Sequence, residues 1–263
     1  MQVRALITGA TSGIGKAFAL LLSQRGFDLV LASRNTAKMR KLQKILPTHV
    51  DIITVDLSKE ADCYQLYAAV KDMPIDLVIN NAGVGAVGQF TQIPLEKELD
   101  MLNLNVRAVH ILTKLFLRDF VRRDHGYILN VASSAGFTAG PLMASYYAGK
   151  NYVLRLTQAV AEELRQEGSQ VRVSALCPGP VDTDFNRNAN AKSAVKGISP
   201  KKAAAAGLRG IFAGKTVILP DGGTYATRLM QRILPERCLL PLTYAIQKRK
   251  EDKHGTGFIR TDQ

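Results

Sequence analysis

The chain has 263 residues, 46% of them hydrophobic, which is enough for one α/β domain with a substantial core. The net charge is +13, and residues 187–263 carry most of it, with 15 Lys/Arg against 5 Asp/Glu. No apolar run reaches the roughly 18 to 20 residues of a membrane span, and the first run leaves no room for a signal peptide; we therefore expect a cytoplasmic protein without a transmembrane segment.

Short aliphatic runs alternate with stretches of helical periodicity up to residue 220. The runs are rich in β-branched residues and show little polar alternation, as in strands buried on both faces. They lie at 3–7, 28–32, 50–55, 76–80, 126–132, 170–176 and 216–219. This order predicts an α/β fold, a Rossmann-type doubly wound seven-stranded parallel sheet with helices on both faces.

Two regions depart from this alternation. Residues 184–200 are rich in Asn, Ala, Lys, Ser and Gly, which indicates a mobile loop or lid. Residues 221–263 follow the last strand and are not needed to complete the sheet. We expect residues 1–220 to form a dinucleotide-binding and catalytic Rossmann domain, with residues 221–263 as a basic C-terminal extension of the same domain.

A glycine-rich turn joins the first expected strand to the first expected helix. Glycines at this place let the backbone approach a pyrophosphate, whose charge is stabilised at the helix N-terminus. The spacing is G-x-x-x-G-x-G, which differs from the commonest dinucleotide fingerprint, and such clusters also occur as structural turns. The candidate cofactor residues of the turn are Gly9, Thr11, Ser12, Gly13, Ile14 and Gly15.

The second expected strand ends at Ser33, and Arg34 follows it. An acidic side chain near this point would hydrogen-bond the adenosine ribose of NAD. A serine hydroxyl with a guanidinium instead suits the extra phosphate of NADP, which an acid would repel. The pair therefore favours NADP over NAD, and the alternative is a surface arginine after a strand.

Tyr146 and Lys150 are spaced i, i+4 in a segment with helical periodicity, so their side chains share one face. A tyrosine hydroxyl has an ordinary pKa near ~10. A fixed ammonium close by, together with an oxidised nicotinamide, would favour the phenolate. Tyr147 and Asn151 repeat the motif one residue later, about 100° around the helix, and we interpret them as bystanders.

These motifs, with others in the same order along the chain, resemble the short-chain dehydrogenase/reductase family. The resemblance covers residues 8 to 183, and the sheet pattern extends it to 220. The matching segments are Thr8-Gly-x-x-x-Gly13-Ile14-Gly15, Asp56-Leu57-Ser58, Asn80-Asn81-Ala82-Gly83, Asn105, Ser133, Tyr146-x-x-x-Lys150 and Pro178-Gly179-Pro180-Val181-Asp182-Thr183.

The resemblance implies an NADP-dependent enzyme that interconverts a carbonyl compound and its alcohol, acting as a homodimer or homotetramer. Tyr146, Lys150, Ser133 and Asn105 match the family's catalytic positions. By that match Ser133 binds the substrate oxygen, with Ser134 as the competing residue, and Asn105 holds a water in a relay with the lysine, with Asn103 competing. The matching cofactor positions are Asp56 at the adenine, Asn81, Ala82, Gly83, Val181 and Thr183, besides Tyr146 and Lys150.

The expected substrate is a small carbonyl compound or alcohol of apolar, acyl or lipid-like character. The segments 84–95, 136–145 and 184–200 supply its candidate lining, namely Val84, Val87, Phe90, Phe137, Leu142, Met143 and Phe185. The widely spaced cysteines, Cys63, Cys177 and Cys238, argue against a disulfide framework or zinc site and suit a reducing compartment. The four histidines show no ligand spacing, so no metal is expected.

The segment from Arg228 to Ile246 mixes apolar residues with arginines. Pro235 and Pro241 argue against one long helix, so we expect two short apolar pieces. They could cap the substrate cleft, pack on a second subunit, or lie on an anionic membrane; we favour capping or subunit packing, which needs no further partner. Alternatives for the whole chain are a non-catalytic NADP-binding regulatory protein or a membrane-associating protein; without a recognition module, nucleic acid is not an expected partner.

Overall fold

The computed structural model describes residues 3–183, 197–254 and 257–260. The predicted seven-stranded parallel sheet is confirmed, with the strand order β3-β2-β1-β4-β6-β7-β8. Its strands are β1 (Arg4–Thr8), β2 (Asp28–Ser33), β3 (Val50–Thr54), β4 (Ile75–Asn80), β6 (Tyr127–Val131), β7 (Arg172–Leu176) and β8 (Val217–Ile218). The order reverses between β1 and β4, which makes the carboxyl ends of these strands the expected ligand edge.

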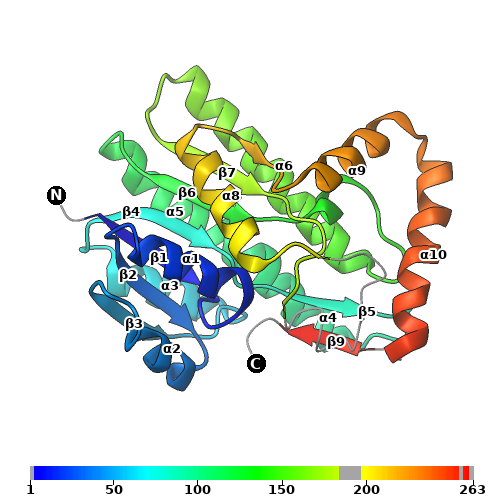
Figure 1. The fold of residues 1–263 in the computed structure, drawn as a ribbon, viewed down its shortest axis with the longest axis horizontal. Coiled ribbons are helices and arrows are strands. Elements are labelled where there is room, and N and C mark those ends of the chain that lie inside the picture. Colours follow the sequence, from blue (N-terminus) through cyan, green and yellow to red (C-terminus); the bar gives the residue numbers. More distant parts are fainter. Residues whose placement is uncertain (1–2, 184–196, 255–256, 261–263) are drawn as a thin grey trace.

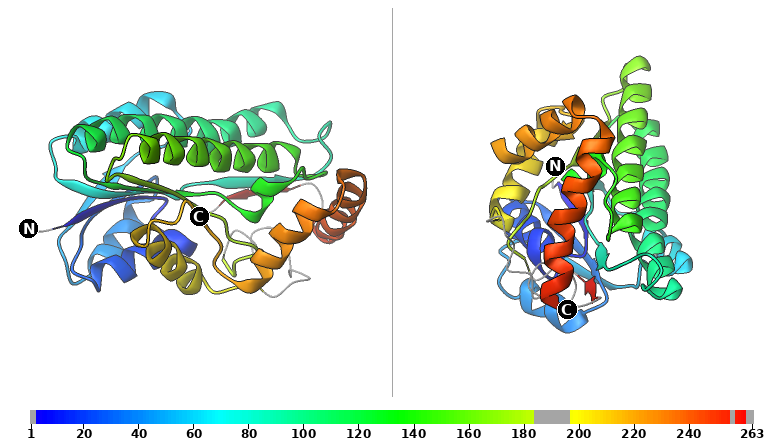
Figure 2. Two further views of the ribbon diagram at one scale, coloured as in Figure 1. Left: turned by 90° about the horizontal axis from the view of Figure 1, so that it is seen from above. Right: turned by 90° about the vertical axis from the view of Figure 1, so that its right-hand side faces the viewer.

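Helices cover both faces of the sheet in two layers (Figures 1 and 2). One layer holds α1 (Gly13–Ser23), α2 (Thr36–Gln43) and α8 (Pro200–Phe212), and the other holds α3 (Glu60–Val70), α5 (Ala108–Arg122) and α6 (Ala144–Gln166). Successive strand residues point to opposite layers, so Leu6 packs in one core with Phe116, and Ile7 packs in the other with Phe18. The central strands are therefore buried on both faces, as their sequence predicts, whereas the edge strand β3 is only partly buried.

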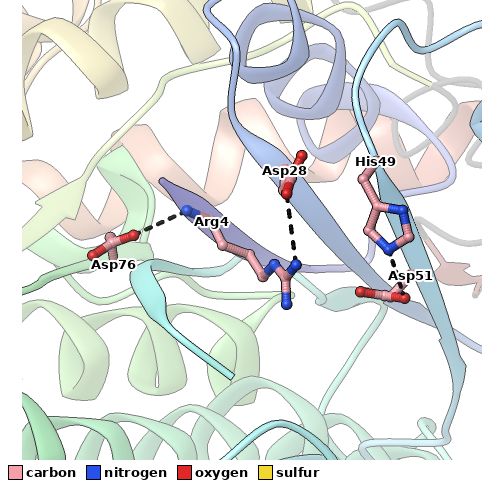
Figure 3. A network of polar contacts seen from close by, with 5 residues as sticks. All are labelled: Arg4, Asp28, His49, Asp51 and Asp76. Carbon is pink, nitrogen blue, oxygen red and sulfur yellow. Dashed lines mark hydrogen bonds and ion pairs between the residues drawn. The ribbon is translucent and has the colours of Figure 1, made fainter. Parts of the chain in front are cut away.

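Polar contacts fasten the amino ends of the central strands, at the edge opposite the glycine turn (Figure 3). The backbone N–H of Arg4 donates to Asp76 at 2.9 Å, and its guanidinium lies 3.6 Å from the Asp28 carboxylate. His49, which precedes β3, lies with its Nε2 atom 3.2 Å from the carboxylate of Asp51 in that strand. These contacts lie at the amino edge of the sheet, so they do not occupy the carboxyl edge, where a ligand is expected.

The C-terminal segment forms two helices, α9 (Gly222–Ile233) and α10 (Glu236–His254), on the side of the molecule away from the N-terminus (Figure 1). The expected break between two pieces occurs at Leu234 and Pro235, and α10 continues through Pro241. The carbonyl that loses its donor belongs to the exposed Arg237, where water can take the place of the missing N–H.

A second, two-stranded antiparallel sheet was not predicted. It joins β5 (Val84–Val87) to β9 (Gly257–Arg260), which are far apart in the sequence. Between β5 and α5 lie α4 (Leu95–Leu102) and a π-helical turn, η1 (Asn103–Arg107). Of the loop expected at 184–200, residues 184–196 lie outside the described residues, and Pro200 already begins α8.

Candidate active site

The glycine turn after β1 has the tight backbone that its sequence predicts. Gly9 and Gly13 have φ of +63° and +51°, which side chains rarely allow. A Cβ on Gly15 would lie 2.2 Å from the carbonyl oxygen of Gly9, so a larger residue cannot fit there. Since α1 begins at Gly13, its N-terminus faces the turn, as an anion site requires.

Asn81, which follows β4, braces this turn from the neighbouring strand. Its Nδ2 donates to the carbonyl oxygens of Thr8 and Gly9 at 3.0 and 3.1 Å. In return, the Thr8 hydroxyl accepts from the backbone N–H groups of Asn81 and Ala82. The Asn-Asn-Ala-Gly segment thus fixes the shape of the cofactor turn.

A hollow opens beside the turn at the carboxyl ends of β1, β2 and β3, and we call it the cofactor hollow. Its lining consists of Gly9, Ala32, Ser33, Arg34, Val55, Asp56, Leu57, Ala82, Gly83 and Leu104. Six of these are cofactor residues expected from the sequence, brought together from four separate segments. The hydroxyl of Thr11 lies 3.4 Å from that of Ser33, so it too is at this edge.

Further contacts position Asp56 in the hollow and the predicted cofactor residues of the loop after β7. The Asp56 carboxylate accepts from the backbone N–H and hydroxyl of Ser58, which orients it. A Cβ on Gly13 would lie 3.0 Å from the Thr183 side chain, and Val181 forms a β-bridge with Ile198. The glycine cradle, the hollow and the β7 loop thus fit an extended dinucleotide along the carboxyl edge.

Lys150 and Tyr146 project from α6 toward the end of β6. Lys150 is buried, and its ammonium donates to the carbonyl oxygen of Val131 at 2.9 Å. The ammonium nitrogen lies 5.9 Å from the centre of the Tyr146 ring. A Cβ on Gly83 would lie 3.6 Å from that nitrogen, so the lysine also borders the Asn-Asn-Ala-Gly segment.

Ser133, rather than Ser134, meets the tyrosine. Ser133 has extended backbone and caps the short 3-10 helix η2 (Ser134–Phe137), its hydroxyl accepting from Ala135 N–H at 3.1 Å. The Ser133 side chain also hydrogen-bonds Tyr146. The backbone N–H of Ser134 donates instead to the Pro178 carbonyl oxygen at 2.8 Å.

The charge states of the pair follow from their burial. Burial raises the pKa of Tyr146 to about 12, against the opposing hydrogen bond with Ser133. Burial also lowers the pKa of Lys150 to about 8. The expected lowering of the tyrosine pKa by the ammonium is thus not found in the protein alone, where burial is the largest effect and the hydrogen bond with Ser133 is the one that opposes it. At neutral pH Tyr146 is a neutral phenol, the form that can donate a proton.

Asn105 lies in the π-helical turn η1, a kind of irregularity often found at functional sites. Its Oδ1 accepts from Val84 N–H at 2.9 Å, and its Nδ2 donates to the Val84 carbonyl oxygen at 2.7 Å. A Cβ on Gly83 would lie 3.1 Å from Oδ1. Asn105 therefore fixes the start of β5 next to the lysine, a role that the sequence did not indicate.

The expected apolar lining is brought together only in part. Val87 and Met143 pack with Tyr146 and Tyr147 at one end of the site. Phe90 is instead 64% exposed, and Phe185 lies outside the described residues.

The C-terminal helices add side chains that sequence reasoning missed. Gln247 of α10 is buried and donates through Nε2 to the Tyr147 hydroxyl at 2.7 Å, which joins α10 to α6. The guanidinium carbon of Arg228 in α9 lies 5.2 Å from the centre of the Phe137 ring. No local pattern marks either residue, since each reaches the site from a distant part of the chain.

Within the described ranges, no group of three or more His, Cys, Asp or Glu side chains is placed to hold a metal ion. None of the helices described is both long and apolar enough to cross a membrane.

Comparisons with known proteins agree with this geometry. The family model described as short chain dehydrogenase matches residues 3–194. A 3-oxoacyl-[acyl-carrier-protein] reductase of Synechocystis sp. is 34% identical, with 72% of this chain and 78% of that protein covered. Estradiol 17-beta-dehydrogenase 11 of Rattus norvegicus is 31% identical, with 89% and 80% covered.

Solved structures show the same fold with cofactors bound. A short-chain dehydrogenase from Sphingobium yanoikuyae in complex with NADPH is 28% identical, with a TM-score of 0.77 and coverage of 89% of this chain and 97% of that one. A short-chain dehydrogenase/reductase from Burkholderia phymatum in complex with NAD is 25% identical, with a TM-score of 0.79 and coverage of 87% and 92%. The chain therefore belongs to the short-chain dehydrogenase/reductase family of oxidoreductases.

Proposed function

We propose that this protein is an NADP-dependent oxidoreductase that interconverts an apolar ketone or aldehyde and its alcohol. The observation that carries the proposal is the grouping of Ser133, Tyr146 and Lys150 beside the glycine cradle. Tyr146 contacts Ser133, and Lys150 borders both the tyrosine ring and the cofactor segment at Gly83. A protein that only binds NADP does not require these three side chains to be grouped beside the cofactor turn.

Each side chain has a distinct task in the proposed reaction. The nicotinamide, when bound, supplies or accepts the hydride. In the reductive direction Tyr146, as a neutral phenol, donates its proton to the carbonyl oxygen, and Ser133 orients that oxygen by a hydrogen bond. Lys150 holds the nicotinamide ribose and supports the tyrosine, and Asn105 fixes the backbone that lies against the lysine.

The choice of NADP rests on the end of β2. Ser33 and Arg34 line the cofactor hollow where the adenosine ribose of a dinucleotide would lie. A guanidinium at this place offers a charge-assisted hydrogen bond to a 2′-phosphate. The proposal of an apolar substrate is based on Val87 and Met143, which pack beside Tyr146. Relatives whose names refer to 3-oxoacyl and estradiol substrates support this proposal.

The test is NADPH oxidation with a panel of aliphatic and aromatic aldehydes and ketones. Wild-type protein should turn over apolar members of the panel, and Tyr146→Phe should lower kcat by about 10²- to 10⁴-fold while NADPH still binds. Tight NADPH binding without turnover of any carbonyl or alcohol would favour the regulatory alternative. Near-normal kcat in Tyr146→Phe would contradict the mechanism.

A second, compatible function is favoured by the outer face of α9. Tyr225, Leu229 and Ile233 are 62%, 50% and 70% exposed on this helix, and Arg237 follows in α10. We propose that this face lies on an anionic membrane, where apolar side chains enter the interface and basic ones meet the headgroups.

A further inference from the structure

The helix α9 turns its polar side toward the protein. Tyr225, Leu229, Met230 and Ile233 are exposed, whereas Thr224 is buried and Arg228 and Gln231 are half-buried. The inner residues 224, 228 and 231 follow the i, i+4, i+7 spacing of one helix face. A helix that only covers an apolar core would be oriented the other way. The inner face of α9 therefore brings polar side chains toward the body of the protein.

That inner face lies over the catalytic edge of the sheet. At the start of α9, a Cβ on Gly179 would lie 3.2 Å from the Thr224 hydroxyl, which places the helix beside the loop after β7. One turn later, the Arg228 guanidinium lies over the Phe137 ring, at the end of the short helix that Ser133 caps. The inner face thus extends from the β7 loop toward the serine turn.

The charge of Arg228 reaches the immediate surroundings of the catalytic residues. Burial raises the pKa of the Cys177 thiol to about 12, and the charges of Arg228 and Lys150 and the Ser133 N–H oppose this rise. Arg228 and Lys150 therefore both act electrostatically on Cys177, which follows β7 and also meets the Ser133 N–H. The geometric contact of the guanidinium is with Phe137, in the short helix that Ser133 caps.

Arg228 and Gln231 on this face lack polar partners among the described residues. Among the described residues, no carboxylate lies within ion-pair distance of Arg228. Asp221, the acid nearest in sequence, accepts hydrogen bonds from the N–H and hydroxyl of Thr224. The Oε1 atom of Gln231 is buried and has no hydrogen-bond partner in the described part of the chain. A cation and a buried amide one turn apart are suited to a ligand that is both anionic and hydrogen-bonding.

We propose that Arg228, supported by Gln231, binds a carboxylate on the substrate, so that the substrate class is apolar oxo acids. This inference rests on the proposed carbonyl reduction and names its substrate class. The reactive carbonyl lies at Ser133 and Tyr146, and the carboxylate end of the molecule reaches the inner face of α9. A carboxylate matches the planar donor geometry of a guanidinium, which can bind it through two hydrogen bonds.

The test compares oxo acids with their methyl esters, which keep the carbonyl and remove the charge. The pairs are 4-formylbenzoate and 12-oxododecanoate with their methyl esters, assayed by NADPH oxidation without lipid. Wild-type protein should prefer each acid. Arg228→Gln should lower kcat/KM for the acids by about 10- to 100-fold, mainly through KM, and should leave the esters nearly unchanged. Arg228→Lys should keep part of the preference.

Arg232→Gln is the matched control, since Arg232 is on the same helix but exposed. It should leave both acids and esters unchanged. Equal kcat/KM for acid and ester in the wild type would overturn the proposal, as would equal losses for both in Arg228→Gln, which would indicate a packing role over Phe137. If no pair is turned over, equilibrium dialysis with NADP-loaded protein decides: an acid that binds no better than its ester also overturns it.

Failure of the proposed function has a different signature. The esters, together with neutral ketones, report on carbonyl reduction without any carboxylate. Turnover of esters that Tyr146→Phe abolishes, with no preference for acids, would keep the proposed function and reject the oxo-acid class.

Discussion

At the scale of single residues, Arg34 decides the cofactor preference that we propose. It lines the cofactor hollow beside Ser33, where a 2′-phosphate would lie. One charge-assisted contact typically contributes about 1.5 to 3 kcal/mol, so NADPH should bind roughly 10- to 100-fold more tightly than NADH. Arg34→Asp should erase or reverse this preference, because its carboxylate repels the phosphate and can bind the ribose hydroxyls.

Fluorescence titration of both cofactors measures this preference directly. Arg40→Asp, in the last turn of α2, is the control, since it makes the same charge change on a residue that does not line the hollow. Equal affinity of the wild-type protein for NADPH and NADH would refute the role given to Arg34.

Lys150 should make cofactor binding depend on pH. Its folded pKa is about 8, below the ordinary value of 10.5, because burial disfavours the ammonium. The lysine therefore loses its charge as pH rises through about 8 in the free protein, and with it the charged hydrogen bonds that we propose it donates to the nicotinamide ribose. The Kd for NADPH should increase between pH 7 and 9 in the wild type, and this increase should be absent in Lys150→Met.

Lys150→Arg separates charge from shape in the same titration, since arginine stays protonated throughout this range. A wild-type Kd for NADPH that does not change from pH 7 to 9 would contradict the proposed role of the Lys150 charge in cofactor binding.

The pKa shifts of Lys150 and Tyr146 change the free energy of unfolding in opposite directions as pH rises. For Lys150 the unfolded chain binds more protons between pH 8 and 10.5, so its contribution to the free energy of unfolding rises with pH there. For Tyr146 the folded pKa of about 12 exceeds the ordinary 10, so its contribution falls as pH rises through that range. Urea unfolding of wild type and Tyr146→Phe between pH 9 and 11 should show a steeper loss of stability in the wild type. Parallel curves would count against the burial of the phenol.

At the scale of elements, α9 separates two environments. Its inner face covers the catalytic edge, and its outer face exposes Leu229 and Ile233. Wild-type protein should sediment with vesicles of phosphatidylcholine and phosphatidylserine at low salt, and less so at high salt, because headgroup attraction is screened. The double variant Leu229→Glu/Ile233→Glu should lose this binding and keep its NADPH oxidation.

Ile45→Glu is the control for this experiment, since Ile45 is 63% exposed on another part of the surface. It should sediment like the wild type. No sedimentation of the wild type at low salt, together with a smaller oligomer for the double variant in light scattering, would show that a second copy covers this face.

At the scale of the whole molecule, the C-terminal extension contributes to the site more than to the core. The described core clusters draw on residues up to Leu219 and on none of α9 or α10. We therefore predict that residues 1–220 alone fold and bind NADPH within a few-fold of the full chain, while kcat/KM for apolar carbonyls falls at least about tenfold through the loss of positioning contacts. Circular dichroism and NADPH titration check this. An unfolded 1–220 fragment would mean that the extension belongs to the core.

Assembly is the other property of the whole molecule that the family resemblance predicts. We propose a homodimer or homotetramer through the outer surfaces of α5 and α6. The His110 and Tyr152 side chains join these helices by a 2.7 Å hydrogen bond and are exposed there. Sedimentation equilibrium of the lipid-free protein should give a mass of two or four chains, and a monomer at micromolar concentration would reject the proposal.

The sequence by itself determined the sheet and the chemistry carried by local motifs. Aliphatic runs such as those of β1 and β2 could be recognised as strands without tertiary context, because a short run of β-branched and aliphatic residues with little polar alternation is typical of a strand buried on both faces. The Gly9-to-Gly15 turn and the Tyr146–Lys150 spacing are likewise short-range patterns, so their geometry is fixed by adjacent residues. The resemblance then gave roles to Ser133 and Asn105 by their order along the chain.

Tertiary structure alone decided which distant side chains complete the site. Gln247 meets Tyr147 across 100 residues, and β9 pairs with β5 from the far end of the chain. Neither contact can be recognised from a local sequence pattern, because each depends on how the C-terminal segment packs against the rest of the chain. The pKa of Tyr146 was likewise decided by the fold, since burial raises it despite the opposing hydrogen bond with Ser133, and burial is a property of the packed molecule.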